Sequence, residues 1–359
     1  YISYFFVFTI LIFQMKKYSL PLEKLGIGFM PYLSLIVPVY NRPQEVQELL
    51  ESLAAQDNRD FEVIIVEDGS TVRCDRIVEQ YKSAIDIKYF FKENSGPGLS
   101  RNYGAERAEG KYVVFLDSDC IIPRQYTQVV RQACQEAGVD AFGGPDRAHD
   151  SFTNIQKAIN YSMTSFFTTG GIRGGKKKMD KFYPRSFNMG VRREVYQALG
   201  GFSNMRFGED IDFSIRIFKG GYQCRLFPDA WVYHKRRTDF KKFFKQVHNS
   251  GIARINLYKK YPESLKVVHL LPAVFTLGVA LLLLCTPFCL FSLVPILLYA
   301  LLVCLDSALQ NKSLRIGIYS IAASFIQLIG YGTGFWRAWW ERCILGRNEF
   351  EAFRKNFYK

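Results

Sequence analysis

The chain has 359 residues, a formal net charge of +14 at pH 7 and a hydrophobic fraction of 48%. Its eight cysteines are scattered, so they indicate neither a disulfide framework nor a zinc site, and a reducing cytosol suits them. The charge would permit nucleic-acid binding, but the sequence has no recognisable nucleic-acid-binding module, so we expect no such partner. Basic groups beside a membrane attract anionic lipid headgroups, which explains the charge better.

Residues 1–15 begin with an apolar run and no initiator Met, which favours the end of a membrane helix or a truncated start. Lys16 and Lys17 behind this run favour a cytoplasmic flank. Further along, apolar β-rich runs alternate with segments of helical spacing. The predicted strands lie at residues 32–39, 61–66, 85–91 and 112–116. Strands that alternate with helices predict an α/β domain with a mainly parallel sheet.

Two carboxylates, Asp117 and Asp119, directly follow the last of these strands. Such a pair is often only a turn or a helix cap. Carboxylate oxygens also suit Mg²⁺ or Mn²⁺, which keep open positions for water and substrate phosphates. Asn41 and Asp68 follow the first two strands, and ligands of parallel sheets bind at the carboxyl ends of strands. We therefore expect these polar strand ends to line one cleft.

Four short motifs give this arrangement its specificity. They are Pro-Val-Tyr-Asn at 38–41, Val-Glu-Asp-Gly-Ser at 66–70, Gly-Leu-Ser-Arg-Asn-Tyr-Gly at 98–104 and Phe-Leu-Asp-Ser-Asp at 115–119. Their order and spacing closely resemble those of the family 2 glycosyltransferases of the GT-A type. The resemblance implies a GT-A nucleotide-diphospho-sugar transferase fold, with a catalytic domain at 31–260, a nucleotide-diphosphate sugar as donor and Mg²⁺ or Mn²⁺ as cofactor.

The resemblance also implies roles for the strand-end residues. The nucleotide base and ribose would be held by Pro38, Tyr40, Asn41, Glu67 and Asp68. The family more often has two aspartates in its second motif, so Glu67 is a mild departure and Asp68 is the safer base contact. Arg101 would reach the diphosphate, Asp117 would lie nearer the ribose, and Asp119 would bind the metal directly. A metal and an arginine together would stabilise the charge of the leaving diphosphate.

Gly-Glu-Asp at 208–210 opens a predicted helix. Acids at this end of a helix are ordinarily explained by capping and by the helix dipole. In the resembling family, however, the Glu-Asp pair carries the general base. The resemblance therefore implies Asp210 as the catalytic base, Glu209 as an acceptor contact or support, and a structural role for Asp212. An inverting transfer needs one carboxylate to take the proton of the attacking hydroxyl.

The predicted strand at 225–234 ends in His234. A lone histidine there is more often structural, but in the resembling family it commonly approaches the diphosphate or the metal, so His234 is a candidate for the metal site. The basic run at 235–237 favours a pyrophosphate role, although a solvated basic turn would look the same. The sugar site is expected within residues 140–190, where Gly144 and Asn188 would line it.

Two further segments bear on the mode of action. The loop at 168–178 is rich in glycine and cations, and is either a mobile lid over donor and acceptor or a surface loop. Processive synthases of this fold carry Gln-x-x-Arg-Trp on a later helix. Gln246 is present here, but Asn249 and Ser250 replace Arg-Trp. A transferase of single sugars is therefore favoured.

Residues 267–305 are almost without charge, and their length exceeds the roughly 20 residues that one helix needs to cross a bilayer. Two crossings are expected there. A second apolar segment at 316–336 ends in a tryptophan cluster and would cross the membrane or lie in its interface. We expect membrane helices at 266–340 and a basic cytoplasmic tail at 341–359, which fits an even number of crossings.

These features predict a multi-pass enzyme of the cell inner membrane with a cytoplasmic catalytic domain. It would move one sugar to a hydroxyl of a cell-surface glycan or lipid-linked acceptor. A processive polysaccharide synthase is an alternative. A nucleotidyltransferase would need a Gly-rich, Lys-bearing loop after its first strand, which residues 38–41 lack. An inactive membrane scaffold would be expected to lose some of its acids, but Asp119 and Asp210 are both present.

Overall fold

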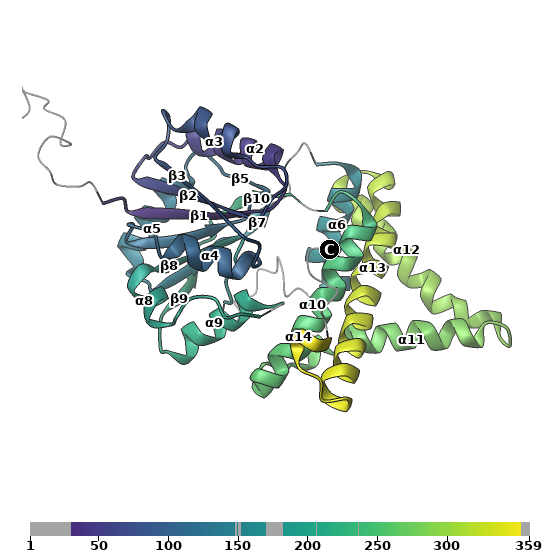
Figure 1. Cartoon of the computed structure of the whole chain (residues 1–359). Coiled ribbons are helices and arrows are strands. Elements are labelled where there is room, and N and C mark those ends of the chain that lie inside the picture. The colour runs from purple at the N-terminus through teal and green to yellow at the C-terminus, as the bar shows by residue number, and fades with distance from the viewer. Residues whose placement is uncertain are drawn as a thin grey trace, which may run out of the picture.

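The computed structural model describes residues 30–147, 149, 152–169, 182–205, 207–235 and 237–352. It consists of an α/β domain and a helical C-terminal part, which lie side by side (Figure 1). Several predictions fall outside the described residues. They are the membrane segment at 1–15, most of the glycine-rich loop at 168–178, Arg236 and the end of the basic tail at 353–359.

The α/β domain is built on a seven-stranded sheet in the order β3-β2-β1-β4-β8-β6-β9. Its first four strands run parallel to one another, as predicted. They are β1 (Leu33–Val39), β2 (Phe61–Asp68), β3 (Ile87–Lys92) and β4 (Tyr112–Leu116). The chain adds β2 and β3 on one side of β1 and then returns to add β4 on the other side. Ligands bind at such a reversal of strand order, so the sheet itself indicates where the site lies.

The other strands complete this edge. In the large sheet, β8 runs antiparallel to its neighbours β4 and β6. A second, three-stranded sheet in the order β5-β10-β7 lies beside it and pairs His234 with Cys120. The ranges are β5 (Cys120–Ile121), β6 (Ala141–Gly143), β7 (Asp146–Arg147), β8 (Asn188–Arg192), β9 (Cys224–Leu226) and β10 (Val232–His234). The small sheet thus brings His234 next to the residue that follows Asp119.

Helices cover both faces of the large sheet, so alternate residues of β1 enter two different cores. Leu35 and Val37 pack against the helices of one face, whereas Ile36 packs against those of the other. The first face carries α2 (Pro43–Ala54), α3 (Asp75–Tyr81) and α5 (Tyr126–Ala137). The second face carries α4 (Pro97–Ala105), α8 (Arg193–Ala198) and α9 (Glu209–Lys219).

The C-terminal part contains three helical stretches that are long and apolar enough to cross a membrane, at Val267–Cys285, Leu290–Asn311 and Leu314–Ile344. Their main helices are α11 (Leu271–Cys285), α12 (Val294–Asn311) and α13 (Leu314–Trp339), after which come a π-helical turn (Trp340–Ile344) and α14 (Glu349–Ala352). Two earlier helices, α6 (Asn154–Thr164) and α10 (Phe240–Lys260), pack against α13, and the short α7 (Phe166–Thr169) follows α6.

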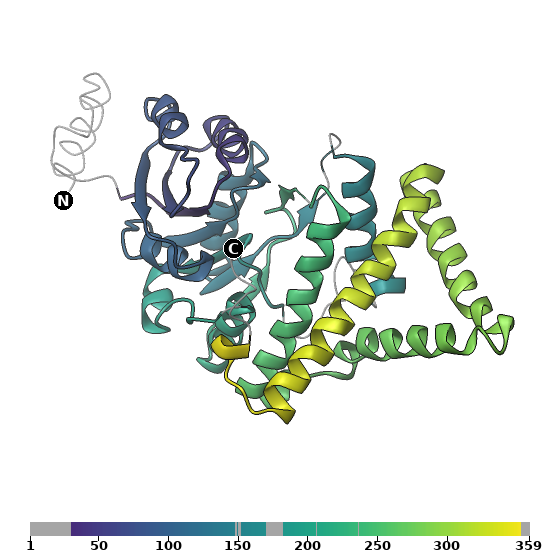
Figure 2. The same ribbon diagram turned by 45° about the vertical axis from the view of Figure 1, so that its right-hand side comes forward.

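Helices α11 and α12 form an open V rather than a closely packed hairpin, and α13 closes the triangle (Figure 2). Rings from all three helices meet inside it. Phe275 and Tyr299 have centroids 5.3 Å apart, and Phe325 lies within 5.9 Å of both. The tip of the V is apolar and open, with Phe288 92% exposed and Phe291 81% exposed. Exposed apolar surface of this kind is typical of contact with a membrane or another protein.

The crossing of α10 and α13 is close because glycines remove side chains from both helices. A Cβ at Gly251 of α10 would lie 2.1 Å from the Tyr331 carbonyl oxygen. A Cβ at Gly334 of α13 would lie 2.0 Å from the His248 carbonyl oxygen. Small residues of this kind let helix backbones approach each other. Helix α10 therefore connects the α/β domain firmly to the apolar helices.

We expect Gly251→Ala to lower the free energy of unfolding by about 1–3 kcal/mol, because the added methyl group overlaps the α13 backbone. Gly278→Ala in α11 is the matched control, since no atom lies within 4 Å of its Cβ position. Helix propensity alone would then raise stability, by up to about 1 kcal/mol. Thermal unfolding of the detergent-solubilised variants measures the difference. Equal melting temperatures would contradict the close crossing.

Candidate active site

The loops after β1 and β2 are joined through Asn41, one of the residues predicted at this edge. Asn41 has a positive φ of 54°, a conformation that asparagine tolerates better than most residues. Its Oδ1 accepts hydrogen bonds from the backbone N–H groups of Thr71 (2.8 Å) and Val72 (3.0 Å), and its own N–H donates to the Ser70 hydroxyl. The asparagine thus fixes the shape of the loop pair predicted to hold the nucleotide.

Pro38 and Tyr40 belong to the same edge. Pro38 lies in β1 opposite Val66 of β2, and Tyr40 follows the strand in a half-buried position. Both residues lie next to Asn41, so the structure brings the three residues of the first motif together. Their contact with a nucleotide remains a prediction.

Asp68 fixes the start of α4. One carboxylate oxygen accepts hydrogen bonds from the Ser95 N–H (2.9 Å) and from Lys92 Nζ (2.6 Å). The other oxygen accepts from the Gly96 N–H (2.9 Å). These contacts anchor the loop that leads into α4 and thereby position Arg101, which that helix carries. A nucleotide base that contacted Asp68 would have to share the carboxylate with these protein donors.

Glu67 has a different environment from its neighbour. Its side chain is fully buried and accepts hydrogen bonds from the Cys74 N–H (3.0 Å) and the Tyr89 hydroxyl (2.6 Å). Burial, together with this hydrogen bond, raises the pKa of Tyr89. Glu67 therefore joins β2 to β3 and α3 inside the domain, and its predicted contact with the nucleotide has no support from this placement.

Arg101 joins the two acidic halves of the site. Its guanidinium group lies 2.7 Å from Asp117 Oδ1 at the end of β4 and 3.3 Å from Glu209 Oε1 at the start of α9. The arginine side chain is only 4% exposed. A buried cation of this kind requires paired carboxylates, because an isolated buried charge is costly. One side chain thus joins Asp117, predicted near the ribose, to Glu209, predicted as an acceptor contact or support and next in sequence to the predicted base.

Asp119 lies at the centre of a cationic group. One carboxylate oxygen lies 3.1 Å from His234 Nε2, and the other lies 2.5 Å from Arg42 and 3.5 Å from Arg237. Burial by itself would raise the pKa of Asp119, but His234 and the two arginines hold it well below its usual value. Asp119 is therefore ionised, and a metal ion would have to share its oxygens with these cationic side chains.

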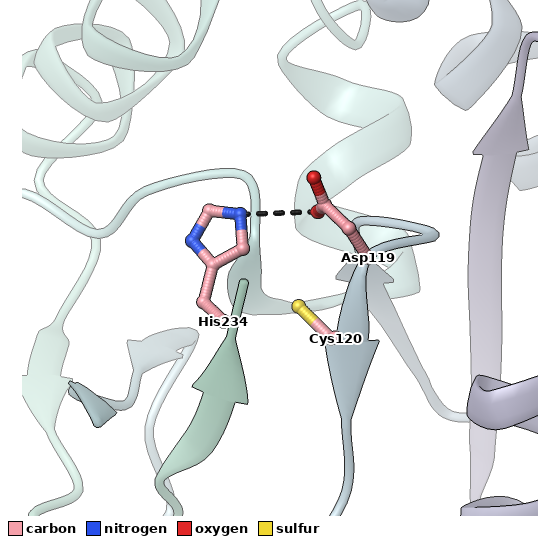
Figure 3. Close-up of side chains that lie close together, drawn as sticks. All are labelled: Asp119, Cys120 and His234. Atoms are coloured by element: carbon pink, nitrogen blue, oxygen red, sulfur yellow. Dashed lines mark ion pairs between the residues drawn. The ribbon is translucent and has the colours of Figure 1, made fainter. Parts of the chain in front are cut away.

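Three side chains are candidate ligands of the predicted metal site. The side chains of Asp119, Cys120 and His234 have potential ligand atoms within 4.8 Å of one another (Figure 3). Burial raises the pKa of the Cys120 thiol well above its usual value, so this side chain is a poor ligand for a hard cation. The Asp119 carboxylate fits Mg²⁺ or Mn²⁺, and the His234 imidazole is the second candidate ligand. His234 stacks on Phe187, with ring centroids 4.9 Å apart, and this packing fixes the plane of the imidazole.

The predicted base lies at the start of α9, where Gly208 adopts a φ of 86° and lets the chain turn into the helix. Asp210 Oδ1 accepts a hydrogen bond from the Ile211 N–H (2.8 Å), and Oδ2 lies 3.4 Å from Arg185. Glu209 is turned toward Arg101 instead. Burial first, and repulsion by Asp210 second, raise the pKa of Glu209 to about 7. The two acids therefore have different environments, with Asp210 directed toward Arg185.

Asp212 lies one step further along α9 and is fully buried. It pairs with Arg216 on its own helix (3.0 Å) and with Lys260 on α10 (2.5 Å), and it accepts a hydrogen bond from the Tyr261 hydroxyl (2.9 Å). These contacts match the structural role predicted for Asp212. They fix α9, and with it the predicted base, against the end of α10.

Asn188 pairs with Leu116, the residue before Asp117, and the Gly144 N–H donates to the Asn188 carbonyl oxygen, but both residues are packed into the interior of the domain. Asn188 is fully buried on β8, accepts a hydrogen bond from the Tyr126 hydroxyl and donates one to the Ala230 carbonyl oxygen, both at 2.7 Å. A Cβ at Gly144 would lie 1.6 Å from the same carbonyl oxygen. The prediction that they line the sugar site has no support from this packing.

Three residues of the site were missed in the sequence. Arg42 follows the first motif, Cys120 follows the fourth, and Arg185 lies in a loop before β8. Arg42 and Arg185 each pair with a predicted site acid that is distant in the sequence. Arg42 and Cys120 could have been noticed locally, because they directly follow Asn41 and Asp119, whereas Arg185 could not.

Comparison with known proteins agrees with this geometry. Residues 34–200 match the family model described as glycosyl transferase family 2. A protein of Rickettsia felis, named an uncharacterized glycosyltransferase, is 33% identical over 142 residues, which are 39% of this chain and 23% of that protein. The chain therefore covers less than a quarter of this relative. Glycosyltransferase AglE of Haloferax volcanii is 27% identical over 258 residues, covering 67% of this chain and 79% of AglE.

Among solved structures, the fold is similar to that of a mannosyltransferase from Pyrobaculum calidifontis, solved in complex with GDP-Man and Mn²⁺. The TM-score is 0.56 at 20% identity, over 84% of this chain and 88% of that chain. The mainly parallel sheet with flanking helices is thus a GT-A-like fold, as the sequence predicted. Residues 34–200 are a glycosyltransferase family 2 domain.

The raised pKa of Glu209 gives a test of the acidic pair. Between pH 4.5 and about 7 the folded protein keeps a proton on Glu209 that the unfolded chain releases. Glu209 therefore makes the free energy of unfolding fall as pH rises through this window. Because Glu209→Gln cannot ionise, we expect its melting temperature, relative to the unsubstituted protein, to be higher at pH 8 than at pH 5.

The matched control is Glu106→Gln, which removes an exposed carboxylate. Its melting temperature should differ from that of the unsubstituted protein by the same amount at both pH values. A Glu209→Gln difference that is also constant between pH 5 and pH 8 would show that Glu209 has an ordinary pKa.

Proposed function

We propose that the protein is a membrane-bound inverting glycosyltransferase. It moves one sugar from a nucleotide-diphosphate sugar to a hydroxyl group of a glycan or of a lipid-linked acceptor. The ion pairs of Arg101 carry most of this proposal, because they join Asp117 to Glu209 at 2.7 and 3.3 Å. The predicted donor side and the predicted base side therefore adjoin one another across a single buried cation.

In this proposal the nucleotide lies on the loops after β1 and β2, with Asn41 shaping its pocket. A Mg²⁺ or Mn²⁺ ion held by Asp119 and His234 would supply positive charge to the leaving diphosphate. Arg42 and Arg237, which pair with Asp119, would remain beside the diphosphate and stabilise the same charge. Arg101 would lie between the diphosphate and the acceptor.

Asp210 is proposed as the base. It would take the proton from the acceptor hydroxyl while the oxygen attacks the anomeric carbon on the side opposite the diphosphate. The anomeric configuration inverts, and no covalent intermediate forms. The hydrogen bond from the Ile211 N–H and the ion pair with Arg185 hold the carboxylate in one orientation. Glu209 would support Arg101 and leave proton transfer to its neighbour.

The enzyme would act at the cytoplasmic face of the cell inner membrane, held there by α11, α12 and α13. Their length and apolar character support this location. The open apolar tip around Phe288 and Phe291 supports it further, because water would otherwise cover these rings. An acceptor in the same membrane would then meet the cleft without leaving the lipid.

Asp119→Ala is expected to abolish metal-dependent binding of the donor nucleotide. The measurement is calorimetric titration of the detergent-solubilised protein with UDP, GDP, CDP and dTDP, each with and without Mn²⁺. The unsubstituted protein should bind one of them, and only with the metal. Asp57→Ala removes an exposed aspartate and should leave this binding unchanged. Failure of the unsubstituted protein to bind any nucleotide would contradict the proposed donor class.

Asp210→Asn should lower kcat for sugar transfer by at least about 100-fold, the lower range for loss of a general base. Donor binding in the presence of Mn²⁺ should stay within about 2-fold, since Asp210 contacts neither Asp119 nor Arg42. Transfer to a lipid extract and nucleotide titration would be measured on the same sample. Full transfer activity in Asp210→Asn would refute the assignment of the base.

A further inference from the structure

A group of four polar side chains lies between the predicted base and the apolar helices. The group consists of Arg185, Arg254 on α10, His269 just before α11, and Tyr331 on α13. Arg254 lies on α10 three residues after Gly251, which packs against the Tyr331 backbone of α13. The charges of Arg254 and Arg185 both act on Tyr331 and on His269. The group adjoins the reaction site through Arg185, which lies 3.4 Å from Asp210.

This group has unmet hydrogen-bonding capacity. The Arg254 Nε atom is buried and has no hydrogen-bond partner, and the buried Tyr331 hydroxyl faces the Arg254 guanidinium group. Among the described residues, no carboxylate forms an ion pair with Arg254. Burying a donor without an acceptor is unfavourable, and two guanidinium groups close to each other repel. An anion between them would relieve both effects.

The group also lies where the chain passes from polar to apolar sequence. Lys266 and His269 are followed by a segment without charged residues that continues as far as Asp306. Helix α11 begins at Leu271, and the Trp336 indole N–H of α13 donates to the Ala273 carbonyl oxygen (3.1 Å), which holds the two helices together. An anion bound here would therefore have charged protein on one side and apolar helices on the other.

We infer that this group binds the phosphate of a lipid-linked acceptor. The inference rests on the proposed function and names the class of its acceptor. Guanidinium groups match phosphate oxygens through paired charge-assisted hydrogen bonds. The lipid chain would lie along α11 and α13, and the sugar or hydroxyl beyond the phosphate would extend toward Asp210. A phospholipid headgroup offers the same phosphate chemistry, so the test must separate the two sources.

The experiment is calorimetric titration of the full chain in a maltoside detergent, which carries no phosphate. The probe is farnesyl phosphate, and the comparison probes are farnesol, inorganic phosphate and dioctanoyl phosphatidylglycerol. Arg254→Gln is the test variant, and Arg254→Lys keeps the charge but loses the planar fork. Lys259→Gln is the matched control, because it removes an exposed cation five residues further along α10. Melting temperatures confirm that each variant is folded.

We expect farnesyl phosphate to bind about 10-fold or more tightly than each comparison probe. Arg254→Gln should weaken its binding at least about 10-fold, Arg254→Lys should weaken it less, and Lys259→Gln should leave it within about 2-fold. Equal binding by folded Arg254→Gln and by the unsubstituted protein would overturn the inference. Equal binding of phosphatidylglycerol would overturn the acceptor assignment and leave a headgroup site.

Nucleotide titration on the same samples separates this inference from the proposed function. Arg254→Gln should keep full metal-dependent binding of the donor nucleotide, since the described partners of Asp119 are Arg42, His234 and Arg237. If no protein bound a nucleotide but Arg254 was still required for farnesyl phosphate, the glycosyltransferase proposal would fail and the lipid-phosphate site would stand. If nucleotide binding was found but farnesyl phosphate binding did not require Arg254, the transferase proposal would stand and the lipid-phosphate site would fail.

Discussion

The arrangement of the active site depends on one buried guanidinium group. Arg101 has lost nearly all contact with water, so its charge depends on the ion pair with Asp117 and on the contact with Glu209. This requirement fixes the start of α9 against the end of β4. The position of Arg101 follows from two features of α4, the helix that carries it. Asp68 anchors the loop before that helix, and Gly104 lets the helix approach Ile36 of β1 to a distance that any side chain would prevent.

Much of this could be predicted from the sequence because the relevant signals are local. Apolar runs that end in carboxylates predict buried parallel strands, and the carboxyl ends of such strands must share an edge. The position of Asn188 could not be predicted in this way. It lies opposite Leu116, directly before the predicted site acids, but its amide is held in the core by Tyr126 and the Ala230 carbonyl oxygen. Arg42 and Arg185 reach the acids across long sequence separations, which no local pattern encodes.

For the apolar helices too, local sequence predicts only part of the structure, and packing between distant residues determines the rest. Composition predicts that residues 267–305 avoid water and are long enough to span a bilayer. It does not predict the angle between helices, which depends on what fills the space between them. Here the rings of Phe275, Tyr299 and Phe325 separate α11 from α12, while glycines draw α13 onto α10. The triangle results because the rings hold α11 and α12 apart, while the glycines allow α13 to approach α10.

Helix α10 contacts α9 and α13 with little room for adjustment at either place. Gly208 directly precedes the acidic pair and lies against α10, where a Cβ built on it would be 3.3 Å from the Ala253 Cβ. Two residues before Ala253, Gly251 of the same helix lies against the α13 backbone. The separation between Asp210 and the apolar helices is therefore nearly constant. In the proposed function, an acceptor hydroxyl would therefore react at one height above the lipid. A glycan that gained a sugar would carry its new end beyond that height, so a rigid α10 would itself limit the length of the product.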